Sequence, residues 1–181
     1  MPRVWEAVLT AGLGLMLLTC AGEPRPVSAP GERDTRAVSF AFGTTEGGEF
    51  SSRGTRGRAT LVLFVTTYDL PSQLEARRVD TIVRRFRPRI NAGAVVLEAP
   101  KYAVFADAFR TTLGLSYPVA LADDETLQRR GPFGVVDRVP TLVVLDRNGR
   151  EVWRKAGVVS PREIEAALDK ASKSRWEYAY P

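Results

Sequence analysis

Residues 60–66 read Thr-Leu-Val-Leu-Phe-Val-Thr, an unbroken run of β-branched, aliphatic and aromatic side chains. Such a run predicts a strand that is buried on both faces, at the centre of a sheet with helices around it. A helix is expected next, because Asp69 can cap its amino terminus and Pro71 lies in the first turn, where no amide donor is needed. Apolar residues then recur at helical spacing from Leu74 to Phe86. The order of strand and helix predicts the α/β class.

Downstream of this helix, the chain continues as an alternation of predicted strands and helices. Residues 92–97 predict a second buried strand, and a helix then begins at Pro100 and ends at Gly114. Its inward face is expected to carry Tyr102, Phe105, Ala106, Phe109 and Leu113. Residues 117–121 predict another short strand, and residues 125–130 predict a short helix. This alternation predicts a central sheet flanked by helices.

The two ends of the globular part predict an edge hairpin and a closing helix. Residues 38–42 alternate bulky and small side chains, and the Gly47-Gly48 pair after them offers a turn back. Residues 141–145 and 151–155 predict antiparallel strands around the turn Asp146-Arg147-Asn148-Gly149. The last helix begins at a capping box, Ser160-Pro161-Arg162-Glu163. We therefore expect a mixed central sheet with an N-terminal edge hairpin.

The composition excludes several classes of chemistry. The chain has 181 residues, which allows one domain with a substantial hydrophobic core. It contains no histidine and a single cysteine, Cys20. These counts exclude Ser-His-Asp and Cys-His nucleophile systems, zinc fingers, a haem held by histidine and an intramolecular disulfide. No cofactor and no metal site are expected.

The first segment of the chain predicts export and a lipid anchor. Residues 7–19 are apolar and have the length of a signal-peptide core, which is too short for a comfortable transmembrane helix. The segment ends in Leu17-Leu18-Thr19-Cys20, which resembles the lipobox of bacterial lipoproteins. That resemblance implies a signal peptide over residues 1–19, diacylglycerol on Cys20 and a proline-containing polar tether over residues 20–37. The other interpretation of Cys20 is a small apolar residue in an uncleaved anchor.

The same resemblance predicts where the protein is located. In bacterial lipoproteins, an alanine such as Ala21 after the lipidated cysteine, rather than an aspartate, resembles the pattern of those sent to the outer membrane. We expect a lipid-anchored protein of the cell envelope that faces the periplasm, with the outer membrane favoured over the inner one.

Basic residues give the chain a net positive charge. Lysine and arginine number 26 against 21 acidic residues, a formal charge of +5 at pH 7. This balance would suit nucleic acid or anionic lipid, although arginines interleaved with acids are typical of a solvated surface. Because export removes the protein from DNA and RNA, nucleic acid is not an expected partner. Contact with anionic lipid stays open.

Several short motifs occur in an order that resembles a known family. Val139-Pro140-Thr141 precedes a hydrophobic strand and a D-x-x-G turn, Gly57-Arg58 precedes the central strand, Tyr117-Pro118-Val119 precedes Asp123, and Phe133-Gly134-Val135 precedes Pro140. In this order the chain resembles the thioredoxin-like redoxins of the TlpA and alkyl-hydroperoxide-reductase group. The resemblance implies a thioredoxin-like domain over residues 38–172 and a tail over residues 173–181. It also implies a cis peptide bond before Pro140, against the active-site loop.

The chain departs from this family at the centre of the family's chemistry. The family pattern there is F-W-A-x-W-C-x-x-C, followed by an acid. In this alignment Asp69 replaces the attacking cysteine, Ser72 replaces the resolving cysteine and Glu75 matches the acid. A carboxylate is not a nucleophile towards sulfur, and a serine cannot complete a disulfide. We therefore expect no thiol redox chemistry here.

Two classes of function remain from the sequence. The first is a redox-inactive binding or assembly module, whose protein partner lies as an extended peptide in a groove formed by Tyr68, Val139, Pro140 and Thr141. The second is a non-thiol enzyme that uses Asp69 and Glu75 as acid and base, with Ser72 as nucleophile and Tyr68 as donor. A thiol-disulfide oxidoreductase would describe the family's ancestry rather than this site.

Overall fold

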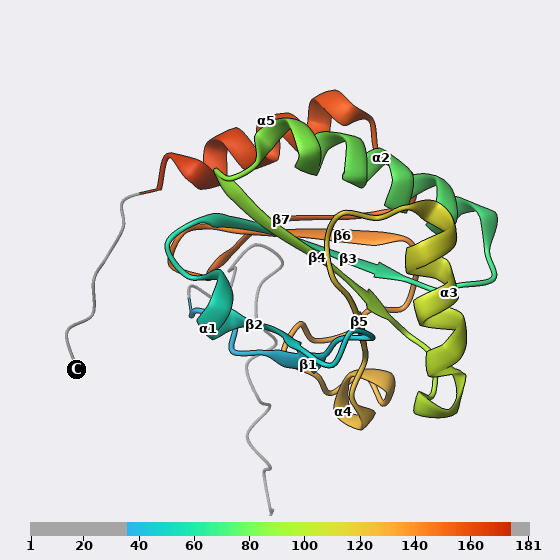
Figure 1. Cartoon of the computed structure of the whole chain (residues 1–181). Helices are drawn as coiled ribbons and strands as arrows, with labels where there is room; N and C mark the ends of the chain where they lie inside the picture. The colour runs from blue at the N-terminus through green and yellow to red at the C-terminus, as the bar shows by residue number, and fades with distance from the viewer. Residues whose placement is uncertain (1–35, 175–181) are drawn as a thin grey trace, which may run out of the picture. The chain divides into compact units, whose positions relative to one another are not determined.

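The computed structural model describes residues 36–174. A five-stranded mixed sheet with the order β5-β4-β3-β6-β7 forms its centre, as Figure 1 shows. The strands are β1 (Ala41–Gly43), β2 (Glu49–Ser51), β3 (Ala59–Val65), β4 (Ile90–Val96), β5 (Val119–Leu121), β6 (Thr141–Leu145) and β7 (Glu151–Ala156). The helices are α1 (Ser52–Thr55), α2 (Leu70–Phe86), α3 (Ala103–Leu113), α4 (Asp124–Leu127) and α5 (Pro161–Ser172), with a 3₁₀ turn at Pro100–Tyr102 before α3.

Strand β3 lies at the centre of the sheet, as its sequence predicts. It pairs parallel with β4 and antiparallel with β6, and all seven of its residues are buried. Its side chains alternate between the two faces: Leu61 and Leu63 join one hydrophobic cluster, whereas Val62 and Phe64 join the other. A strand with a core on each side needs apolar residues at every position, which explains the unbroken run in the sequence.

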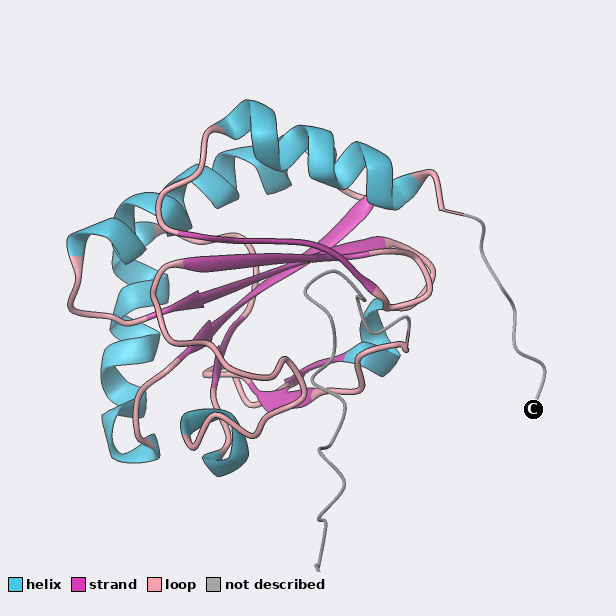
Figure 2. Cartoon of the chain, turned by 180° about the vertical axis from the view of Figure 1, so that it is seen from behind, coloured by secondary structure: helices cyan, strands magenta, loops and turns pink. Residues whose placement is uncertain are grey.

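Helices cover one face of the sheet and the hairpin covers the other. Apolar residues of α2, α3 and α5 share a cluster with one side of the sheet, and three phenylalanines near the hairpin, Phe40, Phe42 and Phe50, share the second cluster. Figure 2 shows the same layers from behind, with α2 and α5 on the far side of the sheet from the hairpin. The predicted α/β fold with a mixed sheet and an N-terminal hairpin is confirmed.

The hairpin differs in detail from its prediction. Strands β1 and β2 form a two-stranded sheet of their own, and β1 covers Ala41–Gly43 rather than all of residues 38–42. The hairpin packs across the face of the large sheet, where Gly93 of β4 leaves room for it. A Cβ at Gly93 would lie 2.6 Å from the Phe50 ring, so a glycine is required for this close approach.

The ends of the helices follow their capping signals. The Asp69 side chain caps α2 by accepting a hydrogen bond from the Ser72 amide, and Gly114 ends α3 in the left-handed conformation. Ser160 and Glu163 form the capping box of α5. The structure also contains cis peptide bonds before Pro88 and Pro140.

Three apolar side chains that were expected to face inward are instead exposed. Leu74 of α2 is 48% exposed, Tyr102 is 41% exposed and Phe105 of α3 is 54% exposed. Phe109 and Ala106, on the same turns of α3, are buried as predicted. Helical spacing alone cannot separate a side chain in the core from one on an apolar surface, which is why these three assignments were wrong.

The predicted signal peptide over residues 1–19, the predicted lipidation site Cys20 and most of the predicted tether lie outside the described residues, as does the predicted tail from residue 175 onwards. Within residues 36–174, no helix has the length and apolar character needed to span a bilayer.

Candidate functional site

The loop that joins β3 to α2, together with the first turn of α2, carries Asp69 and Ser72, the residues predicted to replace the family's cysteines. Asp69 Oδ1 accepts a hydrogen bond of 2.9 Å from the Ser72 amide, and Oδ2 accepts one from the Thr66 hydroxyl. The Ser72 side chain is fully buried, and its hydroxyl accepts a 3.3 Å hydrogen bond from the Thr66 amide. Asp69 and Ser72 thus fasten the first turn of α2 to the end of β3.

Asp69 is held as a carboxylate. Partial burial acts to raise its pKa, but hydrogen bonds from the Ser72 hydroxyl, the Thr66 hydroxyl and the Ser72 amide outweigh burial and leave the pKa below its ordinary value. A low pKa suits a helix cap, because the charged form accepts the strongest hydrogen bonds. It does not suit a general acid or base at neutral pH.

Glu75 lies one turn further along α2 and is completely buried. Its Oε2 accepts hydrogen bonds of 3.3 Å from the Val159 amide and 3.1 Å from Arg78, whose guanidinium also donates to the Val159 carbonyl. Its Oε1 is buried without a hydrogen-bond partner among the described residues. Burial raises the pKa of Glu75 above its ordinary value, although the Val159 amide and Arg78 oppose this effect.

The predicted groove residues lie at the same end of the sheet as the Asp69 loop. The register pairs Thr141 of β6 with Phe64 of β3, so residues 139 and 140 continue towards the end where β3 leaves the sheet. Tyr68 is 78% exposed and Val139 is half-buried. Pro140 and Thr141 are buried, with the Thr141 hydroxyl donating to the Arg138 carbonyl at 2.6 Å. Side chains available to a partner here are those of Tyr68 and, in part, Val139.

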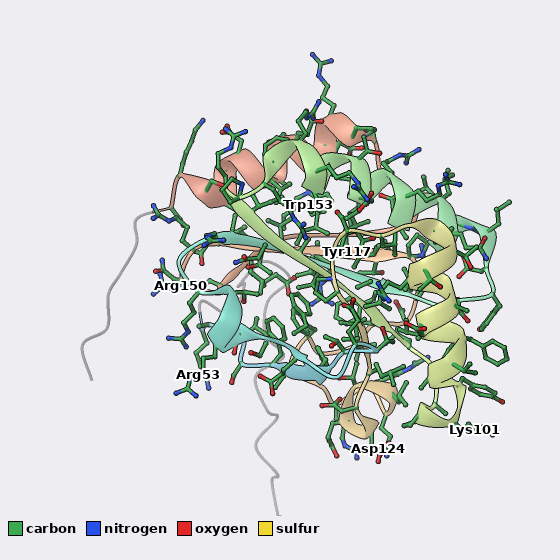
Figure 3. All side chains as sticks on the ribbon, viewed as in Figure 1. Arg53, Lys101, Tyr117, Asp124, Arg150 and Trp153 are labelled. Carbon is green, nitrogen blue, oxygen red and sulfur yellow. The ribbon has the colours of Figure 1, made fainter. Side chains whose placement is uncertain are left out.

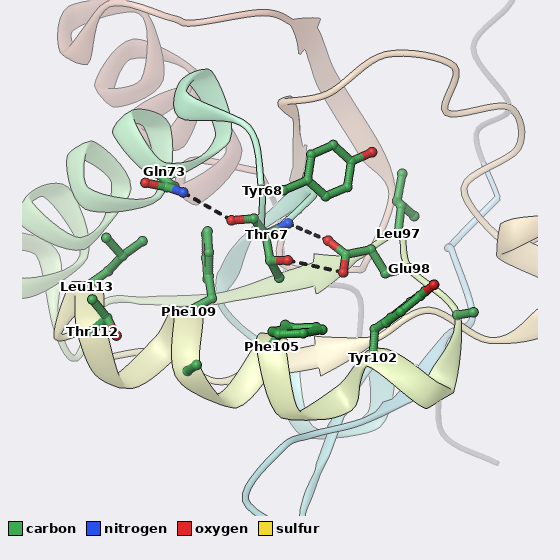
Figure 4. Close-up of a pocket in the computed structure, with 12 residues that line it drawn as sticks. Thr67, Tyr68, Gln73, Leu97, Glu98, Tyr102, Phe105, Phe109, Thr112 and Leu113 are labelled. Carbon is green, nitrogen blue, oxygen red and sulfur yellow. Dashed lines mark hydrogen bonds between the residues drawn. The ribbon is translucent and has the colours of Figure 1, made fainter.

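A cavity of about 740 Å³ opens beside this loop, between the start of α2 and the face of α3, as Figure 4 shows. Aromatic and aliphatic side chains form most of its wall: Tyr68, Leu97, Tyr102, Phe105, Phe109 and Leu113. Its polar groups are already paired in part, since Glu98 accepts hydrogen bonds from the amide and hydroxyl of Thr67, and Gln73 donates to the Thr67 carbonyl. The cavity can therefore accept a bulky apolar group.

The sequence predicted Tyr68 as a site residue, but the other residues that line this cavity were not predicted to belong to a site. Tyr102 and Phe105 were assigned to the core, and Glu98 was not considered. One signal could have found them: after Pro100 the chain places apolar residues on more than one helix face, at 102, 104, 105, 106 and 109. That stripe is wider than a helix at the edge of a small sheet can bury.

The described residues contain no group of three or more Cys, Asp or Glu side chains that could hold a metal ion. Asp69 and the Oε2 atom of Glu75 instead accept hydrogen bonds from backbone amides, the Thr66 hydroxyl and Arg78.

The fold and its likeness to solved structures define the class: the chain carries a thioredoxin-like redoxin domain. Among solved structures, it is similar to a thiol:disulfide interchange protein of the thioredoxin family from Chlorobium tepidum TLS. The two share 26% identity with a TM-score of 0.63, over 77% of this chain and 97% of the other.

Two further structures share the fold at lower identity. A secreted Mycobacterium tuberculosis disulfide oxidoreductase homologous to E. coli DsbE has 15% identity and a TM-score of 0.62, over 74% of this chain and 96% of its own. StoA from Bacillus subtilis has 19% identity and a TM-score of 0.58, over 74% and 98%. No protein-family model matches the chain, and no curated protein matches it significantly.

Proposed function

We propose that this chain is a membrane-tethered, extracytoplasmic thioredoxin-like protein that binds a protein partner and carries out no thiol chemistry. In this proposal, a lipid on Cys20 anchors it in the cell envelope, on the periplasmic side and with the outer membrane favoured. The single cysteine of the chain supports the absence of a dithiol, because a C-x-x-C reaction requires two. Asp69 and Ser72 stand where the family has its cysteines.

The observation that carries the proposal is the apolar surface around the Asp69 loop. Tyr68 and Leu70 are 78% and 75% exposed, and Leu74 follows one turn later on α2. Tyr102 and Phe105 continue this surface across the cavity on α3. Clustered exposed aromatic side chains of this kind mark interaction sites, because leaving them in water has a free-energy cost that a partner removes.

An extended segment of a partner protein suits this surface. The cavity has room for a bulky apolar side chain, and its mouth is bordered by Tyr68, which can pack along a peptide. The hydrogen-bonding groups of Glu98 are engaged with Thr67, so the wall offers shape and apolar contact more than charge. We therefore expect the partner to present an aromatic or large aliphatic side chain.

The alternative of a non-thiol enzyme gains no support from the geometry. Both oxygens of Asp69 accept hydrogen bonds within the loop, and Glu75 is fully buried beneath it. Neither carboxylate is available to a substrate in this arrangement. The direct check is turnover of ester, phosphoester or peroxide substrates, which should show no rate that depends on Asp69 in a comparison with Asp69→Asn.

The proposal can be tested by purifying the affinity-tagged full chain from detergent-solubilised membranes and identifying proteins that copurify. The informative variants are Tyr68→Ala and Phe105→Ala, and Val104→Ala is the matched control. Val104 is 68% exposed and precedes Phe105 on α3, but it does not line the cavity. Loss of a central aromatic contact should weaken binding about thirtyfold, as for interface hot spots.

A partner that is recovered in stoichiometric amount with the parent and with Val104→Ala, and lost with both aromatic variants, supports the proposal. Equal recovery from all variants would show that the partner binds elsewhere and would overturn it. Cys20→Ser separates the lipid anchor from the binding site, because this variant should lose the lipid and yet still bind the isolated partner.

A further inference from the structure

A cluster of arginines lies at the end of the sheet opposite to the Asp69 loop. Strands β3 and β4 run parallel and start together, with Ala59 paired to Ile90. The segments that lead into these two starts carry most of the cluster: Arg53, Arg56, Arg58, Arg87 and Arg89. All five are exposed. Seven residues of β3 separate this end from the Asp69 loop, a distance of roughly 20 Å.

Contacts across three segments hold the cluster together. The β6–β7 turn packs on the chain before β3, because Gly57 donates to the Arg147 carbonyl at 2.9 Å and Arg147 Nε donates to the Gly57 carbonyl at 3.1 Å. A surface hollow of about 360 Å³ is lined by Arg58, Arg89 and Arg147 together. The arginines therefore form one continuous basic end of the domain, made of Arg53, Arg56, Arg58, Arg87, Arg89 and Arg147.

Few acidic groups offset this basic end. Among residues 36–174, no acidic residue lines the hollow between Arg58 and Arg147, and Glu49 lines the neighbouring hollow beside Arg58 and Arg87. Some arginines elsewhere on the surface are paired with acids, as Arg84 is with Asp80 and Arg130 with Glu125. The basic end thus carries a local excess of positive charge.

The chain from the N-terminal segment enters the domain at this same end. Val38 donates to the Gly149 carbonyl at 2.8 Å, and Ala37 forms a β-bridge with Arg150. Figure 3 shows Arg53 and Arg150 on the same side of the molecule, away from Lys101 at the start of the α3 region. The described part of the chain therefore begins beside the basic end.

We infer that the basic end docks on the headgroups of anionic lipids and so turns the Asp69 loop and its apolar cavity away from the bilayer. Charge complementarity and the entry point of the chain both favour this occupant. Arginines near an anionic surface each strengthen membrane binding about fivefold, an effect that salt screens. This docking goes beyond partner binding at Tyr68, and it does not depend on whether Cys20 is lipidated.

The test compares vesicle binding of the full chain in a Cys20→Ser background, by flotation with phosphatidylcholine vesicles and with vesicles containing phosphatidylglycerol. The ratio of the two partition coefficients reports the electrostatic contribution to binding, since the apolar segment at residues 7–19 contributes equally to both coefficients. The test variant is Arg53→Gln, Arg56→Gln and Arg58→Gln combined. Its matched control is Arg77→Gln, Arg129→Gln and Arg162→Gln, which removes the same charge from exposed positions outside the basic end.

We expect the phosphatidylglycerol preference to fall about a hundredfold in the test variant, to change little in the control variant and to collapse between 50 and 500 mM salt. An equal fall in both variants, or no preference in the parent, would overturn the inference. Displacement from vesicles by a single-stranded oligonucleotide at physiological salt would overturn it in favour of a general polyanion site. Partner recovery through Tyr68 and Phe105 should be unaffected by the test variant, so this inference and the proposed function can fail separately.

Discussion

Two carboxylates on the first turns of α2 experience opposite environments. Asp69 sits half-exposed at the helix start, with both oxygens hydrogen-bonded and a lowered pKa. Glu75 lies beneath the loop with no exposure and a raised pKa, and one of its oxygens has no hydrogen-bond partner within residues 36–174. The first is explained completely by the helix that it caps. The second stabilises no helix end, and it joins α2 to the loop before α5 through Val159.

This difference shows that Asp69 acts locally at the start of a helix, whereas Glu75 links separate elements of the fold. Asp69 has a local structural role, because its side chain caps the start of α2. Glu75 keeps a buried charge whose desolvation is only partly offset by Arg78 and the Val159 amide. A carboxylate in such a place links α2 to the loop before α5 instead of capping a helix.

The largest expected effect comes from restoring the missing thiols. If Asp69 and Ser72 lie where the two cysteines of an active thioredoxin-like protein lie, the combined variant Asp69→Cys and Ser72→Cys should form a disulfide. In a Cys20→Ser background, we expect it to speed the reduction of insulin by dithiothreitol several-fold, because a thiol at a helix start has a lowered pKa. The parent should match dithiothreitol alone.

Each single cysteine variant is the control for this experiment, since one thiol can form a mixed disulfide but cannot resolve it. Mass spectrometry of the double variant reports the disulfide directly. A double variant that folds but stays reduced in air would show that the two positions are not aligned as a C-x-x-C pair.

The second effect concerns the stability that Glu75 provides. Glu75→Ala leaves the Val159 amide and the Arg78 guanidinium without their acceptor, and it opens a cavity in the core. We expect a loss of about 3 kcal/mol in the free energy of unfolding, measured in urea. Glu75→Gln keeps the volume and one acceptor oxygen, so it should cost less. Equal and small losses in both variants would contradict a framework role for this carboxylate.

The sequence predicted the strands and helices well because the signals that specify them are local or periodic. The run at residues 60–66, the cap at Asp69 and the capping box at Ser160 each specify one element, and the order of short motifs indicated the thioredoxin-like arrangement. The hairpin's position across the sheet was not predictable, since it depends on Gly93 and Phe50 meeting in space.

The candidate site could be predicted only where a motif marks it. Asp69, Ser72 and Glu75 were predicted as site residues from the resemblance to the family's pattern, and Tyr68 from being next to Asp69. The cavity wall at Tyr102 and Phe105 could not be assigned, because the same helical spacing describes a core face and an exposed apolar face. Which of the two occurs depends on how α3 packs against the sheet, and that information is not local. The entry of the chain beside the basic end is likewise a property of the fold alone.

The third prediction tests the local role of Asp69. Asp69→Ala removes the acceptor for the Ser72 amide, and we expect a loss of about 1 kcal/mol in the free energy of unfolding. Asp69→Asn keeps a capping oxygen and should cost only a few tenths of that. The measurement is again urea unfolding, at pH 7. If Asp69→Ala were more destabilising than Glu75→Ala, the helix cap would contribute more to stability than the buried carboxylate, contrary to this prediction.

The smallest effect is the pH dependence, in which the two carboxylates should differ in sign. Asp69 has a lowered pKa in the folded protein, so its contribution is present above the ordinary value of about 4 and is lost as pH falls through the folded pKa. Glu75 has a raised pKa, so its contribution is present below about 4 and is lost as pH rises through the folded pKa.

Unfolding free energies of Asp69→Asn and Glu75→Gln, measured against the parent from pH 3 to 7, separate the contributions of the two carboxylates. The parent's advantage over Asp69→Asn should shrink at the acid end, whereas its advantage over Glu75→Gln should grow as pH falls from 7 towards 4. Two curves that move in the same direction would mean that the carboxylates share one environment, which the buried and unpartnered Oε1 of Glu75 argues against.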